Sequence, residues 1–329
     1  MAALVTGQIF PVKSFIKAIG LVLVIAATGY FVYELYAQRA VFAEINWSWP
    51  AMLAMAGSIA GMLTITLLGG VAWRILLADQ GFKLPWPTAM RLVALSQIGK
   101  YLPGNVGHFV GQVALSRAVG IPVGVSVAAL GISTVWLIAL GVGVGSAGLI
   151  EAAANSGVSW MPAFTPGRLI PLFMLLIALP WIGIFVLNHF LPRLSEALGK
   201  GQKIVPPSIG AAAFLTSVFL GTFVIFGLML KVQSSTLFDT PDVGVITFML
   251  LFASAWVAGY LIPGAPGGVG IREAMMLLLF TPLLGAGPAA ALGLSMRIAT
   301  TLGDGAAFLA GLAIGWAQKN KEKRNETHA

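Results

Sequence analysis

Long, continuous apolar runs dominate the chain. A helix needs about 20 apolar residues to cross the hydrocarbon core of a bilayer. The runs are continuous, whereas the strands of a membrane barrel alternate apolar and polar residues. The pattern therefore predicts an all-α polytopic membrane protein with about six full transmembrane helices: Phe15–Tyr36, Ala51–Ala72, Val123–Ile150, Leu169–His189, Ile209–Leu230 and Ala286–Trp316.

Two further apolar regions, 88–119 and 244–284, are interrupted near their middles by proline and glycine. The first break reads Lys-Tyr-Leu-Pro-Gly-Asn-Val-Gly over 100–107, and the second reads Tyr-Leu-Ile-Pro-Gly-Ala-Pro-Gly-Gly-Val-Gly over 260–270. Each Pro-Gly follows shortly after a Tyr-Leu pair. We interpret the regions as two broken-helix or re-entrant hairpins in a weak internal repeat. The chain would have ten spans if both hairpins crossed the membrane.

The positive charges predict the topology. With the N-terminus inside, most lysines and arginines lie on the cytoplasmic side, as the positive-inside rule requires. Three spans then separate the hairpins, so the two halves are inverted and the hairpins enter from opposite sides. We expect one integral membrane domain over 1–329, both termini in the cytoplasm and a basic tail at 318–329. The cytoplasmic cations are Lys13, Lys17, Arg74, Lys83, Arg91, Arg193, Lys200, Lys203, Lys319, Lys321, Lys323 and Arg324.

Composition supports this class and excludes others. Charged residues make up 9% of the chain, against about 25% in soluble proteins. The net charge of +8 lies in short loops and the tail, so we expect no nucleic-acid partner. The chain has no cysteine, and its three histidines lack metal-ligand spacing. We expect no metal, no cofactor, no catalytic residues and no enzymatic activity.

The two breaks carry the candidate chemistry. A new helix is predicted to start after each, near Asn105 and Ile271, and a helix N-terminus favours an anion. Glycines would let a phosphate approach the backbone, and Lys100 and Arg272 add positive charge. The alternative is that both breaks are simple kinks, since proline and glycine are frequent in membrane helices. The substrate-binding residues expected at the breaks are Lys100, Pro103, Gly104, Asn105, Gly107, His108, Pro263, Gly267, Gly268, Gly270 and Arg272.

Three further charges lie within apolar sequence. Glu273 falls in the first turn of the helix after the second break, where the helix dipole favours an acid. Arg297 lies about eleven residues into the last run, and Asp304 is two turns further along the same face. Charges at such depth face the bundle interior and have partners. We expect Arg297 to pair with Glu273 or with a substrate phosphate; a purely architectural ion pair is the alternative.

His108 stands beside the first break, near Gln97, Asn105 and Gln112. It could relay protons or line a polar path. The simpler interpretation is a neutral histidine with its hydrogen bonds satisfied.

The two breaks resemble the signatures of the lysylphosphatidylglycerol synthase/flippase transmembrane family. The stretch Ile-Gly-Lys-Tyr-Leu-Pro-Gly-Asn-Val-Gly over 98–107 is similar to its first signature. The stretch Ile-Pro-Gly-Ala-Pro-Gly-Gly-Val-Gly-Ile-Arg-Glu over 262–273 is similar to its second and more specific one. The family's arginine in the following helix would be Arg297. The resemblance extends roughly from the first span to the last.

The sequence departs from the family pattern at two points. His108 follows Gly107, where the family often has a second glycine and soon an arginine; here the next arginine is Arg117. The full aminoacyl-lipid synthases also carry a soluble C-terminal transferase domain, whereas this sequence ends about a dozen residues after Trp316. We therefore expect no aminoacyl transfer.

The resemblance implies flippase-like translocation of an anionic lipid between leaflets of a bacterial inner membrane. The lipid would be a phospholipid or a polyprenyl-phosphate carrier. Two alternatives stay open: a secondary transporter of a small soluble anion, and a membrane-embedded enzyme or accessory subunit in envelope-lipid synthesis. A cavity that opens laterally between helices would favour lipid. Glycine-rich faces such as Gly141, Gly143, Gly145 and Gly148 allow close packing within one chain or between two copies, so a homo-oligomer is also open.

Overall fold

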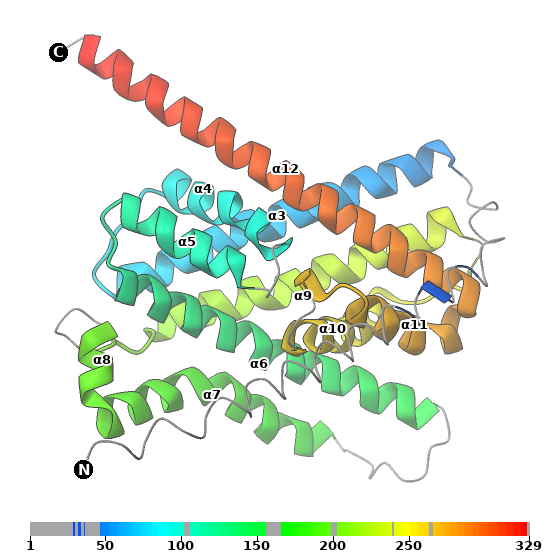
Figure 1. Ribbon diagram of the computed structural model, residues 1–329. Coiled ribbons are helices and arrows are strands. Elements are labelled where there is room, and N and C mark those ends of the chain that lie inside the picture. The colour runs from blue at the N-terminus through cyan, green and yellow to red at the C-terminus, as the bar shows by residue number, and fades with distance from the viewer. Residues whose placement is uncertain are drawn as a thin grey trace, which may run out of the picture.

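The computed structural model describes residues 29, 32–33, 36, 47–101, 106–155, 166–198, 203–238, 240–262 and 266–327. Within these ranges the regular structure is entirely helical (Figure 1). The first predicted span, Phe15–Tyr36, lies outside the described residues except for four single positions, 29, 32, 33 and 36. The same holds for four of the predicted site residues: Pro103, Gly104, Asn105 and Pro263.

Five long helices correspond to the other five predicted spans. Each contains a stretch long and apolar enough to cross a membrane, which confirms these runs as helices. Their buried faces meet in one core that includes Trp73, Trp136, Phe223 and Met296. The five helices are α3 (Trp49–Asp79), α6 (Val123–Asn155), α7 (Pro166–Phe190), α9 (Ile209–Leu237) and α12 (Ala286–Thr327).

Side chains tie two helix ends together on one side of the bundle. The Ser208 hydroxyl accepts a hydrogen bond from the Ala211 amide at 3.2 Å and so caps α9. The Asp79 carboxylate, at the end of α3, accepts from the Ser208 amide at 2.9 Å. The short helix α8 (Pro192–Leu198) precedes this junction. Polar capping thus fixes where α9 begins relative to α3.

The two interrupted regions each form a pair of neighbouring helices. The first pair is α4 (Trp86–Ser96) and α5 (Gly107–Ala118), with the 3-10 turn η1 (Gln97–Tyr101). The second is α10 (Val245–Leu261) and α11 (Ile271–Leu284), with the turn η2 (Pro266–Gly268). In Figure 1 the pairs occupy opposite ends of the bundle, and η1 contacts η2. The two breaks, far apart in sequence, therefore meet inside the protein.

The glycine-rich face of α6 packs within this chain. A Cβ on Gly145 would lie 2.8 Å from the Ser254 amide nitrogen, and one on Gly148 would lie 2.7 Å from the Leu250 carbonyl carbon. The Ser254 hydroxyl donates to the Gly145 carbonyl at 2.8 Å. Gly143 instead faces the Phe173 ring of α7. Absence of side chains here brings α6 and α10 into backbone contact.

A second glycine contact joins the two arms of the first pair. A Cβ on Gly99 would lie 2.5 Å from the Gly107 carbonyl carbon. We expect Gly99→Ala to lower the free energy of unfolding by about 1–3 kcal/mol, because the added methyl forces η1 and α5 apart. The control is Gly131→Ala on α6, where nothing lies within 4 Å of the new methyl. Unfolding midpoints in detergent measure both variants, and equal midpoints would contradict the close contact.

Candidate functional site

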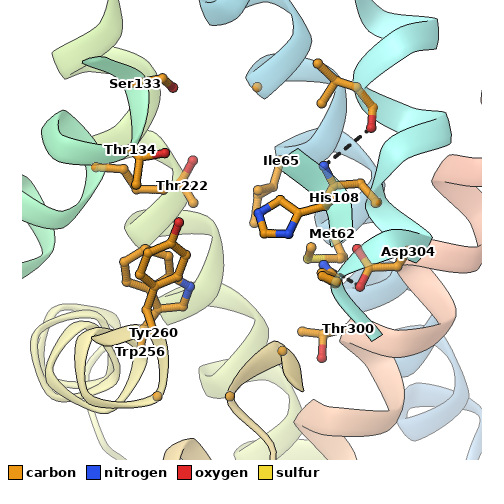
Figure 2. Close-up of a pocket in the computed structure, with 18 of the residues that line it drawn as sticks. Met62, Ile65, His108, Ser133, Thr134, Thr222, Trp256, Tyr260, Thr300 and Asp304 are labelled. Atoms are coloured by element: carbon orange, nitrogen blue, oxygen red, sulfur yellow. Dashed lines mark hydrogen bonds and ion pairs between the residues drawn. The ribbon is translucent and has the colours of Figure 1, made fainter. Parts of the chain in front are cut away.

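A cavity of about 250 Å³ lies where the two breaks meet. Both breaks and parts of α3, α4, α5, α6, α9, α10, α11 and α12 line it. Figure 2 shows two different walls: His108 and Asp304 stand on one side, and Thr134, Thr222 and Tyr260 on the other. One wall is charged, and the opposite one carries hydroxyl and aromatic groups.

Glu273 organises the second break. Its Oε2 accepts a hydrogen bond from the Gly270 amide at 2.8 Å, and its Oε1 lies 3.0 Å from an Arg272 nitrogen. The same Oε1 is 3.7 Å from Nη1 of Arg297. Gly270 has φ = 81°, a conformation that favours glycine. The predicted Arg297–Glu273 pair is therefore present, and Glu273 also occupies the amide at the start of α11.

Asp304 organises the first break. Its Oδ2 lies 2.5 Å from the Lys100 ammonium and accepts a hydrogen bond from the Tyr101 hydroxyl at 2.6 Å. The Asp304 side chain is 1% exposed and that of Lys100 is 19% exposed. A buried carboxylate is stable only with such partners. Asp304 thus holds η1 against α12, a contact that the sequence did not predict.

Tyr101 and Arg297 connect the two breaks. Nη1 of Arg297 donates to the Gly267 carbonyl at 2.8 Å, and its guanidinium carbon lies 5.8 Å from the Tyr101 ring centre. The Lys100 ammonium is also 5.8 Å from that ring. Among the described residues, the lining thus has three cations, Lys100, Arg272 and Arg297, and one carboxylate, Asp304. A second carboxylate, Glu273, lies behind the lining and pairs with Arg272 and Arg297. Together, the three cations and two carboxylates have a formal excess of one positive charge.

Several buried polar atoms on the cavity wall have no partner. Among the described residues, these are Nε1 of Trp73, Nδ1 of His108, Nε of Arg272 and Oδ1 of Asp304. Unpaired buried polar atoms are destabilising, and they are most often explained by water, an ion or a ligand. For His108, Nδ1 has no partner among the described residues, so both interpretations of this histidine stay predictions. The cavity therefore offers unused hydrogen-bonding capacity on its charged side.

The structure brings most of the predicted site residues together. Those on the cavity wall are Lys100, His108, Gly267, Gly268, Arg272, Arg297 and Asp304. Glu273 lies behind Arg272 and Arg297, and Gly107 and Gly270 begin or precede helices just outside the lining. Gln97 and Gln112 join His108 on the wall as expected.

Sequence reasoning missed the opposite wall and the tyrosine between the breaks. The missed residues are Tyr101, Ser133, Thr134, Thr222, Trp256, Tyr260 and Thr300. Tyr101 and Tyr260 begin the Tyr-Leu pair that precedes Pro-Gly in each break, so their matched positions could have indicated a shared role. The hydroxyl residues of α6 and α9 have no distinguishing pattern in the sequence.

The fold and this site define a multi-pass helical membrane protein with a charged internal cavity at two broken helices. The family model for the lysylphosphatidylglycerol synthase TM region matches residues 17–307. The chain belongs to this family, which suggests a function related to membrane lipids. No curated protein matches the chain.

Proposed function

We propose that the protein translocates an anionic lipid between the leaflets of a bacterial inner membrane. The observation that carries the proposal is the cavity at the meeting point of the breaks, with Lys100, Arg272 and Arg297 on its wall. These three positive charges outnumber the negative charges of the paired carboxylates, Asp304 and Glu273, by one. A phosphate group at a phospholipid or polyprenyl-phosphate headgroup matches this excess.

The short arms of both helix pairs support a re-entrant arrangement. α4, α5, α10 and α11 contain 11, 12, 17 and 14 residues, fewer than the about 20 that a spanning helix needs. With the N-terminus inside, the first hairpin enters from the cytoplasm and the second from outside. Inverted repeats with broken helices at their interface are a recurrent transporter architecture.

In this mechanism the headgroup enters the cavity while the acyl chains stay in lipid. The three cations bind the phosphate, and the hydroxyl wall of Thr134, Thr222 and Tyr260 offers hydrogen bonds to the rest of the headgroup. Glu273 and Asp304 hold the cations in place before and after the phosphate binds. Movement of one inverted half against the other would alternate access to the two leaflets. No catalytic step is part of the proposal.

The test is leaflet exchange by the purified protein in proteoliposomes. The panel holds labelled phosphatidylglycerol, phosphatidylcholine and a polyprenyl phosphate, with protein-free liposomes as the control. We expect exchange of anionic lipids at least about tenfold faster than of phosphatidylcholine, since a buried charge-assisted contact exceeds 1.4 kcal/mol. No exchange of any lipid by folded protein under an imposed proton gradient would contradict the proposal. That result would favour a soluble-anion transporter or an accessory subunit.

A further inference from the structure

An apolar groove runs along the outside of α5 and α6. It has a volume of about 470 Å³ and is lined by Phe109, Val110, Val113, Ala114, Val123 and Val127. Arg117 is the one charged residue among the described residues that line it. Val110 is 65% exposed and Val127 is 43% exposed, so the groove opens on the face of the bundle. It is distinct from the charged cavity described above.

Phe109 separates the groove from the cavity. Its side chain lines both spaces. On the cavity side its ring lies 3.9 Å, centre to centre, from the ring of His108, which points into the cavity (Figure 2). The Phe109 side chain thus connects the apolar groove with His108, whose Nδ1 has no hydrogen-bond partner among the described residues.

Arg117 marks the other end of the groove. It lies in the last turn of α5 and is exposed, and no carboxylate of the described residues forms an ion pair with it. Eight residues separate it from Phe109, about 12 Å along a helix. One leaflet contributes about 15 Å of hydrocarbon. The groove therefore has the length of an acyl chain segment within one leaflet, with a cation at the level of a phosphate.

From this arrangement we propose that the groove is the lateral portal for the lipid substrate. An acyl chain lies along α5 between Val110 and Val127, its phosphate is bound by Arg117, and Phe109 is the partition that the headgroup passes to reach the cavity. The inference rests on the proposed function for the identity of the cargo. A soluble anion would need neither an apolar groove nor a portal facing lipid.

The test combines photo-crosslinking with leaflet exchange. Purified protein in detergent micelles receives a phosphatidylglycerol with a diazirine in one acyl chain, and mass spectrometry locates the labelled residues. We expect labelling to concentrate on the groove residues. Ala114→Trp should abolish it and slow lipid exchange at least about tenfold by filling the groove. The matched control, Val224→Trp, puts the same side chain on an exposed position of α9 and should change neither.

The outcomes separate this inference from the proposed function. Labelling spread evenly over exposed helix faces, or normal exchange by Ala114→Trp, would overturn the portal even if the wild-type protein exchanges lipid. Groove labelling that Ala114→Trp removes, without exchange of any lipid, would support the lipid site and contradict translocation. Arg117→Gln should weaken labelling by the phosphatidylglycerol probe but not by a diacylglycerol probe, which has no phosphate. Equal weakening of both probes would contradict binding of the phosphate by Arg117.

Discussion

Arg297→Gln is expected to slow anionic-lipid exchange roughly 10- to 100-fold, the range that follows from losing one charge-assisted hydrogen bond of about 1.5–3 kcal/mol. Arg297 is the cation that touches both breaks, through the Gly267 carbonyl and the Tyr101 ring. Glutamine keeps a donor for Gly267 but removes the charge offered to a phosphate. The measurement is the exchange rate in proteoliposomes, after size-exclusion chromatography shows that the variant is folded.

Two further variants test whether the effect depends on the charge of Arg297 and on its position in the cavity. Arg297→Lys keeps the charge but loses the planar guanidinium, so exchange should fall less than in Arg297→Gln. Arg193→Gln makes the same change at an exposed arginine in α8 and should leave exchange at the wild-type rate. If folded Arg297→Gln exchanges lipid as fast as Arg193→Gln, the cavity is not the headgroup site.

Asp304→Asn is expected to lower the free energy of unfolding by about 3–5 kcal/mol, because it leaves the largely buried Lys100 without its counter-charge. Lys100 and Tyr101 both depend on the Asp304 carboxylate, and asparagine preserves its shape but not its charge. The unfolding midpoint in detergent, followed by denaturant titration, measures the loss. The double variant Lys100→Met/Asp304→Asn should recover part of the stability, since no unpaired charge remains.

The chain supplies a matched control for this pair. Lys231 and Asp242 form another lysine–aspartate pair, but the Asp242 side chain is 89% exposed. Exposed pairs contribute about 0–1 kcal/mol, so Asp242→Asn should leave the midpoint almost unchanged. Equal losses in the two asparagine variants would show that burial of Asp304 does not determine its contribution.

Much of the fold was predictable because a lipid-facing helix must be apolar along its whole length. That requirement makes α6 and α9 visible as uninterrupted runs and makes the proline–glycine breaks visible as exceptions to them. The predicted start near Ile271 is the start of α11. α5 begins at Gly107, two residues after the predicted start near Asn105.

The pairing of the charges was only partly predictable. Spacing placed Asp304 on the same face as Arg297, and the Arg297–Glu273 contact was expected. That Asp304 instead meets Lys100 and Tyr101, more than 200 residues away in sequence, depends on the approach of the two breaks. Helical periodicity specifies a face but not the neighbour that the face meets. The threonines of the opposite wall likewise become recognisable only once the cavity brings them together.

The glycine face of α6 limits how this protein can change shape. Gly145 and Gly148 lie against the backbone of α10, and the Ser254 hydroxyl is hydrogen-bonded across the contact, so α6 contributes no side chain at these two positions that could deform. Such an interface transmits displacement rather than absorbing it. A tilt of α10 is therefore expected to move α6 with it. Gly259, near the C-terminal end of α10, lies against the backbone and Cβ of Arg272. A displacement of α10 would therefore reach the backbone of Arg272, whose side chain lines the cavity.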